Sequence, residues 1–323
     1  MESDTSLNGI LGPRARLCRR ALTGEHGVSL PPIVDHHVHL HLFDEQRLAA
    51  RGVAAVLDLG GDPELLARRD RDTLPHAAYA GAFLTAPGGY PSGRSWAPAG
   101  IVREVRDPSL HPGVPAGAAT AVDEQVECSA SVVKVALNAD AGPVFDAQTL
   151  EAIVASAHEH RLPVVAHVQG AGMLDLALDA RVDALAHAPF SEWVDGRAIA
   201  RAIALRQRWI STLSIHDGAD RERARMNLEV FAHAGGHVLY GTDLGNGERP
   251  VGVDADELAA LDAAGIRGAD LVAMLTEPWL PSLRTTAVAT FVPGPPPTAL
   301  AAVPDWLSAA TVVPAEDLVH DEE

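Results

Sequence analysis

The chain has 323 residues, and its 25 basic and 43 acidic side chains give a formal net charge of −18. Hydrophobic residues account for 47% and charged residues for 21%, which is typical of a globular protein and excludes a disordered or collagen-like chain. The acidic balance argues against nucleic acid or a membrane as partner, because both need clustered positive charge. We expect a small-molecule substrate, and the composition leaves a homo-oligomer open.

No segment of the sequence indicates an exported or membrane-spanning protein. Cys18 and Cys128 are too few and too far apart for a disulfide framework or a zinc finger. The longest uncharged run, Thr285 to Pro304, contains four prolines around Gly294 and cannot continue as a membrane helix. The first residues lack the apolar stretch of a signal peptide. We therefore expect a cytoplasmic protein.

Short apolar runs alternate with helical patterns over residues 33–279. The runs predict eight strands, at residues 33–35, 53–59, 77–83, 132–137, 164–167, 182–186, 209–215 and 238–242. The clearest helix is predicted over 146–161, where apolar residues recur at helical spacing and Asp146 or Gln148 begins the first turn.

This alternation predicts an α/β fold with parallel strands, because each return crossing between parallel strands needs a helix. The strands are apolar throughout, as expected when both faces are covered. Eight such units predict a (β/α)8 barrel of the TIM type. A doubly wound open sheet is the alternative, but Gly60-Gly61-Asp62-Pro63 is a poor match to its phosphate-binding turn.

The flanks of the barrel differ in composition from its centre. Residues 1–32 and 280–323 have little periodicity, and neither is long enough to form a core alone. We expect them to form a residual small β module or to pack irregularly around the barrel. The Gly- and Pro-rich stretch from Thr85 to Pro115 predicts a long loop after the third strand, and loops of this length are often functional.

Four histidines and an aspartate stand where the predicted strands end. His37 and His39 fall two residues apart in the first strand, so both side chains point the same way. His167, His187 and Asp243 each close an apolar run, which in a barrel places them on the carboxyl-terminal rim. A buried histidine at one such position is usually structural, but imidazoles and a carboxylate converging on one rim suit zinc or a similar metal.

Lys134 is the one lysine of the chain, against 24 arginines, and it lies within the apolar run Ser131 to Leu137. Burying a charged ammonium there is costly. Unlike arginine, a buried lysine can lose its proton and act as a nucleophile. A neutral amine can add carbon dioxide to give a carbamate, which could bridge two metal ions. The alternatives are a lysine that reaches the rim or pairs with a carboxylate, and a Schiff-base lysine.

Together these residues resemble the amidohydrolase superfamily, in particular its binuclear members with a carboxylated lysine on the fourth strand. The likeness covers roughly residues 30–280. Within that group the chain is most similar to the prolidase-like and imidazolonepropionase-related branch, through the stretches Leu30–Leu40, Ala80–Tyr90, Ala157–His167, Ile210–Ser214 and Tyr240–Leu244.

This resemblance implies a ligand set and a mechanism. His37 and His39 would hold one divalent ion together with Asp243, His167 and His187 would hold a second, and carboxylated Lys134 would bridge them. Zinc is the expected metal. A hydroxide shared by the two ions would attack an amide, a cyclic amide or a dipeptide-like C–N bond, with Asp243 as its proton acceptor.

Two departures from the family concern specificity more than chemistry. The family usually carries a β-sandwich built from both termini, and here the flanks are short. Tyr90 stands where this branch often has histidine, so it is a candidate substrate contact, as is His216 after the seventh strand. Hydrolysis of a lactone or organophosphate ester, a metal-dependent lyase or dehydratase, and a non-catalytic metal-binding barrel are the alternative functions.

Overall fold

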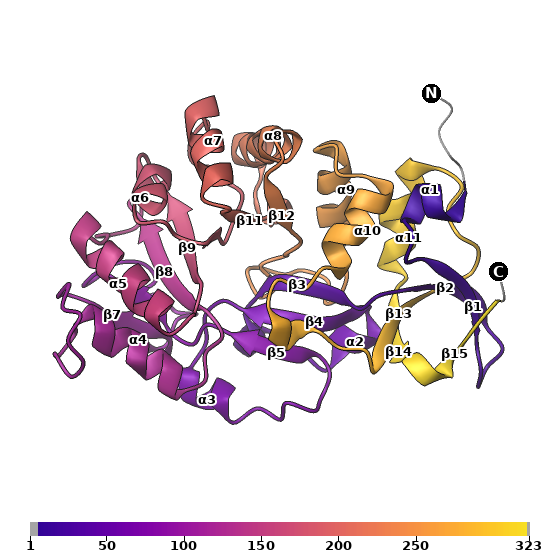
Figure 1. Cartoon of the computed structure of the whole chain (residues 1–323), viewed down its shortest axis with the longest axis horizontal. Helices are drawn as coiled ribbons and strands as arrows, with labels where there is room; N and C mark the ends of the chain where they lie inside the picture. Colours follow the sequence, from indigo (N-terminus) through magenta and orange to yellow (C-terminus); the bar gives the residue numbers. More distant parts are fainter. Residues whose placement is uncertain (1–5, 322–323) are drawn as a thin grey trace.

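The computed structural model describes residues 6–321, which fold into two parallel sheets, a surrounding set of helices and an antiparallel sheet at one end (Figure 1). The larger parallel sheet has the spatial order β12 (His237–Leu239), β11 (Arg208–Ile210), β10 (Ala184–Leu185), β9 (Val164–Gln169), β8 (Val133–Asn138), β6 (Phe83–Thr85) and β7 (Val102–Glu104). The smaller contains β3 (Ile33–Val38), β4 (Val53–Asp58) and β5 (His76–Tyr79). An α/β fold with parallel strands is therefore confirmed.

Each of the eight predicted strands overlaps an observed strand, but the third is broken and the last two are shorter than predicted, ending at Ile210 and Leu239. Residues 77–83 were expected to be continuous, whereas β5 ends at Tyr79 and β6 begins at Phe83. The break turns at Gly81, which has a φ of +74°. Because β5 pairs with β4 while β6 pairs with β8, the break divides the strands into two sheets.

Backbone hydrogen bonds join the two parallel sheets at both of their margins. On one side the amide of Ser131 donates to the carbonyl of Tyr79 over 2.8 Å. On the other, the amide of His36 donates to Tyr240 over 2.9 Å, and Val38 forms a parallel bridge with Leu244. These contacts place β3 beside β12, so residues far apart in the sequence reach one end of the strands together.

The strands also enclose a common apolar interior. One cluster of buried residues takes side chains from seven strands and from the residue before β8; it includes Val34, Ala55, Ala78, Val132, Val165, Ala184, Ile210 and Leu239. A larger cluster fills the space between strands and helices. Burial of both strand faces explains why the sequence of these strands is apolar throughout.

The long loop after the third strand is partly ordered into structure. Within 85–115 it forms a single turn, η2 (Ala99–Ile101), followed by β7, which pairs with β6 in parallel. A small cluster of Phe83, Ala97 and Ile101 anchors this segment against the sheet. The loop is therefore held in place over one end of the strands.

The helices lie along the outer side of the strands (Figure 1). They are α3 (Pro63–Ala67), α4 (Ala118–Glu127), α5 (Ala147–Glu159), α6 (Met173–Asp179), α7 (Gly196–Ala204), α8 (Gly218–His233), α9 (Ala255–Ala263) and α10 (Gly268–Thr276). Helix α5 confirms the prediction over 146–161, and Asp146 is its N-cap, because its carboxylate accepts from the amide of Thr149 at 2.7 Å. Among residues 6–321, no helix has the length and apolar character required to cross a membrane.

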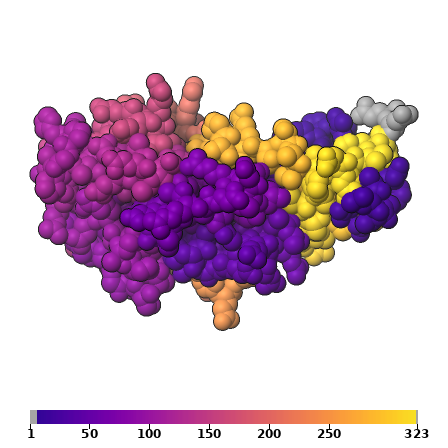
Figure 2. All heavy atoms as spheres, turned by 90° about the horizontal axis from the view of Figure 1, so that it is seen from below, coloured from indigo at the N-terminus to yellow at the C-terminus, as the bar shows by residue number. Residues whose placement is uncertain are grey.

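Strands from both flanks build the antiparallel sheet. Its order is β14 (Thr311–Pro314), β13 (Val288–Pro293), β2 (His26–Leu30), β1 (Arg16–Arg20) and β15 (Leu318–His320). Figures 1 and 2 show the indigo and yellow segments side by side at one end of the molecule. Cys18, Phe291, Val313 and Leu318 pack together there. Of the flanking segments predicted at 1–32 and 280–323, residues 1–5 and 322–323 lie outside the described part.

Candidate metal centre

A cavity of about 440 Å³ opens where the parallel strands end, and six side chains singled out in the sequence line it: His37, His39, Lys134, His167, His187 and Asp243. This volume is within the range of small-molecule sites. The six residues come from β3, β8, β9 and the segments that follow β3, β10 and β12. All are buried, with exposed fractions of 8% or less.

His37, His39 and Asp243 form one side of the centre. The Nε2 atoms of His37 and His39 lie 3.1 and 3.2 Å from the same carboxylate oxygen, Oδ1 of Asp243. Each Nδ1 atom instead bonds to a backbone carbonyl, at 2.8 Å for His37 with Ala186 and 3.1 Å for His39 with Gly60. These bonds fix the rings so that both Nε2 atoms face the cavity, the arrangement typical of metal-binding histidines.

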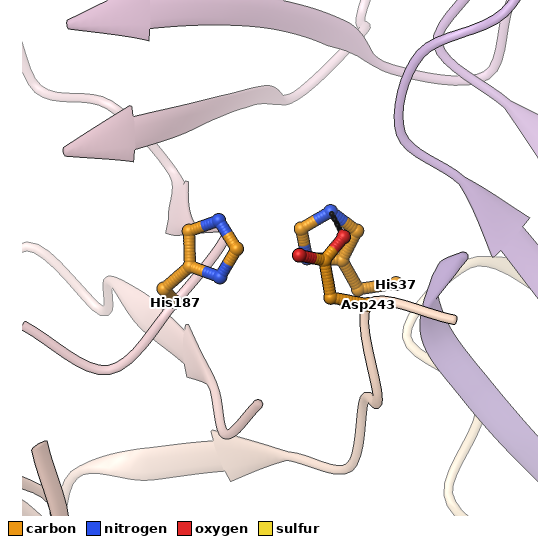
Figure 3. Close-up of side chains that lie close together, drawn as sticks. All are labelled: His37, His187 and Asp243. Carbon is orange, nitrogen blue, oxygen red and sulfur yellow. Dashed lines mark ion pairs between the residues drawn. The ribbon is translucent and has the colours of Figure 1, made fainter. Parts of the chain in front are cut away.

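His167 and His187 form the other side. The Nε2 of His187 lies 3.1 Å from the Nδ1 of His167, and the Nδ1 of His187 lies 2.9 Å from the hydroxyl of Thr212. The Nε2 of His167 lies 3.2 Å from the amide nitrogen of Asn138. Figure 3 shows the ring of His187 across a gap from His37 and Asp243, and ligand atoms of these three residues lie within 4.8 Å of one another.

The contacts around Asp243 leave atoms without hydrogen-bond partners. Among the described residues, neither Nε2 of His37 nor Oδ1 of Asp243 has a hydrogen bond of acceptable geometry, although they are 3.1 Å apart. Two atoms bound to one zinc ion in a tetrahedral site stand about 3.3 Å apart. The spacing and the unpaired atoms therefore fit two ligands of one cation better than they fit a hydrogen bond.

Lys134 is the second residue of β8, and its side chain lines the same cavity as the histidines, with 1% exposure. Its Nζ lies 5.7 Å from the centre of the Phe83 ring. Burial lowers the pKa of Lys134 to about 7, although Asp243 and Asp58 act in the opposite direction. A substantial share of this amine is therefore neutral at neutral pH, as carbamate formation requires.

The imidazoles of the centre differ in their charge. Burial lowers the pKa of His167 to about 3 and that of His187 well below its ordinary range. Burial likewise holds the pKa of His37 far down, despite Asp243. For His39, burial is outweighed by the adjacent, negatively charged carboxylate of Asp243, and its pKa is raised. Three of the four rings are therefore neutral, the form that binds metals.

Asp243 is held ionised and oriented. Burial favours its neutral form, but His37 and His39 outweigh burial and keep its pKa well below the ordinary value. Its backbone is in the left-handed region, with a φ of +53°. Asn246, three residues later, donates its Nδ2 proton to Oδ2 over 2.9 Å, which leaves Oδ1 to face the histidines.

Neighbouring buried residues support the strand ends. Asp35 accepts from the amide of His37 at 3.0 Å and from the hydroxyl of Thr242 at 2.6 Å, so it ties β3 to the segment bearing Asp243. Burial raises the pKa of Asp35 to about 7. His36 points away from the cavity, where its Nδ1 bonds to the carbonyl of Tyr240 at 2.9 Å, so it is structural.

Both predicted substrate contacts also line the cavity. Tyr90 stacks on His167 with the ring centres 5.1 Å apart, and the ring of His216 lies 4.0 Å from that of Phe190. Sequence reasoning missed several further lining residues, among them Leu42, Phe83, Trp96, Gln169, Phe190 and Asn246. Phe190 and Asn246 each lie three residues after a predicted ligand, which was an available signal; Trp96 had none beyond its place in the long loop.

Solved structures share this fold. A Xaa-Pro dipeptidase with bound methionine in its active site superposes with a TM-score of 0.70 at 16% identity, over 91% of this chain and 87% of the other. Ochratoxinase from A. niger gives 0.67 at 19%, over 88% and 81%. Phenylurea hydrolase B gives 0.66 at 16%, over 90% and 85%. No family model matches the sequence, and no curated protein matches it.

Proposed function

We propose that this chain is a metal-dependent hydrolase of the amidohydrolase type, which cleaves an amide, a cyclic amide or a dipeptide-like C–N bond. One observation carries the proposal: four imidazoles, one buried lysine and one ionised aspartate meet in a single cavity at the strand ends. The fold shared with a dipeptidase and two named hydrolases supports it. We infer a small molecule as substrate, and a homo-oligomer is compatible with this activity.

We also infer that the two parallel sheets together make an eight-stranded barrel. The hydrogen bonds from β5 to Ser131, just before β8, and from β3 to Tyr240, just after β12, support closure together with the shared apolar interior. On this interpretation residues 33–279 form the barrel, and residues 1–32 and 280–323 form a small β module beside it. The cavity then opens at the carboxyl-terminal rim, where barrel enzymes place their active sites.

The residues fit a pair of divalent cations, with zinc suited to this donor set. His37, His39 and Asp243 would hold one ion, His167 and His187 the other, and a carbamate on Lys134 would contact both. When bound, such a pair lowers the pKa of water and polarises a carbonyl group. Three of the imidazoles are neutral and the pKa of Lys134 is lowered. Few protons must therefore be released from the side chains when the metal ions bind.

The side chains of the chain itself manage the proton. The carboxylate of Asp243 lines the cavity and can accept a proton from an attacking water, then return it to the leaving nitrogen. Asn246 donates to Oδ2 and so holds the carboxylate in its orientation. Tyr90 and His216 stand beside this group and can bond to the substrate.

Metal analysis and native mass measurement test the proposal. After reconstitution with zinc and bicarbonate we expect two ions per chain and a mass gain of about 44 Da on Lys134, the mass of carbon dioxide. Lys134→Arg should keep the fold and lose the mass gain and the amidase activity. His158→Gln, on the outer helix α5, is the control and should keep both.

A substrate screen tests the reaction class. Amides, lactams, dipeptides, lactones and organophosphate esters are offered to the metal-loaded protein. Turnover of amides with full activity in Lys134→Arg would refute the carbamate, and fewer than one ion per chain would refute the binuclear centre. Turnover restricted to lactones or organophosphate esters, or elimination in place of hydrolysis, would overturn the C–N assignment.

A further inference from the structure

Aromatic side chains form a large part of the cavity lining beyond the ligand residues. Ring contacts run without a gap from His39 to Phe83 (5.7 Å between centres), from Phe83 to Trp96 (6.0 Å), and from Trp96 to Tyr90 (6.0 Å). Tyr90 then stacks on His167. One wall is therefore a continuous aromatic surface that joins one pair of ligand histidines to the other.

A second part of the cavity wall is formed by Phe190, Ile215 and His216. Phe190 packs against His216 with 4.0 Å between ring centres, and it lies 6.3 Å from His187. Ile215 lines the cavity beside this pair. Two groups of aromatic rings, one in contact with His39 and His167 and the other with His187, favour a planar apolar group in the cavity, because offset stacking adds to the burial of apolar area.

The polar groups that face the remaining space are neutral hydrogen-bonding groups. Gln169, Asn246 and the hydroxyl of Tyr90 line the cavity. The Nε2 atom of His216 is buried without a hydrogen-bond partner among the described residues, so it is available to a ligand. These groups can orient an amide or a hydroxyl but cannot neutralise an anion.

Within residues 6–321, no arginine lines this cavity, and the one lysine that does is Lys134, among the ligands. Two arginines stand close in sequence to lining residues but do not line the cavity themselves. Arg249 donates its Nη2 proton to the carbonyl of Ser214 at 2.9 Å and pairs with Asp254 at 3.3 Å, while its Nε and Nη1 have no partner among the described residues. Arg94 is exposed and lies 5.8 Å from the centre of the Tyr90 ring. A carboxylate placed against the aromatic side chains, away from the metal ligands, would lose water without gaining a cationic side chain as partner.

We propose that the substrate is a neutral amide that bears a flat aromatic group and carries no carboxylate beside its scissile bond. This inference rests on the proposed function and narrows it, because dipeptides and N-acyl amino acids become poor substrates. The net charge of −18 acts in the same direction, since a negative protein repels anionic substrates as they approach.

Two matched pairs of compounds test the proposal with the zinc-loaded protein. N-Acetylphenethylamine and N-acetylphenylalanine differ only in the carboxylate, and so do N-phenethylmethanesulfonamide and N-methylsulfonylphenylalanine, which resist hydrolysis. We expect the neutral amide to have the higher kcat/KM by at least about tenfold, and calorimetry to show the neutral sulfonamide binding tighter by a similar factor.

The two readouts separate this inference from the proposed function. If neither amide is hydrolysed but the neutral sulfonamide still binds about tenfold tighter, the amidase assignment fails and the substrate class stands. Equal or tighter binding of the carboxylate compounds, or no binding of either sulfonamide, would overturn the substrate class.

Variants locate the binding surface. Trp96→Leu should weaken binding of the neutral sulfonamide at least about fivefold, because it removes one aromatic face. Phe190→Leu should do the same from the other wall, which guards against a folding defect in one variant. Trp193→Leu is the control, since this tryptophan is 61% exposed and does not line the cavity. If Arg94→Gln abolishes a preference for carboxylates, Arg94 is an anion site and the proposal is wrong.

Discussion

Replacing Lys134 by methionine in the metal-free protein should change how stability depends on pH. The amine has an ordinary pKa of 10.5 and a folded-state pKa of about 7, lowered by burial. Between these values the unfolded chain binds more protons than the folded one, so the free energy of unfolding rises with pH. Integrated from pH 7 to 10.5, this gain amounts to about 4 kcal/mol.

Urea unfolding, followed by circular dichroism in chelator and carbon dioxide-free buffer, measures this gain. Because the chain has no other lysine, the difference between wild type and Lys134→Met isolates one amine. That difference should grow by about 4 kcal/mol in favour of the wild type as the pH rises over this window.

Val135→Ala, a substitution at the next residue of the same strand, is the matched control. It should lower stability by a constant of about 1–2 kcal/mol at every pH, because it removes only apolar volume. A flat difference between wild type and Lys134→Met from pH 7 to 10 would refute the conclusion that burial deprotonates this lysine.

Three further predictions concern the metal centre and the broken strand. Asp243→Asn should lower kcat by about 10²–10⁴-fold on the best amide substrate. Its melting temperature should stay close to wild type, since asparagine tolerates the φ of +53°. A variant with wild-type kcat would show that Asp243 is not the proton acceptor. Removal of metal by a chelator should abolish activity and lower the melting temperature, and added zinc should restore both. Hydrolysis of substrate by the chelated protein would contradict a metal-dependent reaction. Gly81→Ala should lower the free energy of unfolding in urea by about 2 kcal/mol or more, because a Cβ there would stand 2.3 Å from Oε1 of Gln125. Gly24→Ala, at a similar φ with open space around it, should lower it by only about 1 kcal/mol. Equal losses in the two variants would show that the backbone conformation alone matters.

Strand positions and the residues at strand ends were predictable from sequence because both leave local signals. Runs that are apolar on both faces mark buried strands, and a polar residue that closes such a run, as His167 does, must face the strand ends. Lys134 was conspicuous for a related reason, since a charge within an apolar run has no ordinary explanation. The structure places all these side chains in one cavity.

The break in the third strand and the aromatic walls were not predictable. The run from Ala77 to Phe83 stays apolar through the break, and only Gly81 marks it. Trp96 and Phe83 lie next to each other because a loop folds back across the strands, a contact that depends on tertiary packing. An aromatic residue that lines a cavity looks, in sequence, like one that fills a core.

The antiparallel sheet can complete its folding only late in synthesis of the chain. Strand β1 pairs with β15 through Cys18 and His320, roughly 300 residues apart, so this pairing waits until nearly all of the described chain has left the ribosome. Until then β1 carries an open edge during translation. Arg16, Arg19 and Arg20 lie on that strand, and such charges oppose pairing with other nascent chains. Arg20 acquires its partner, Asp317, only when the sheet closes.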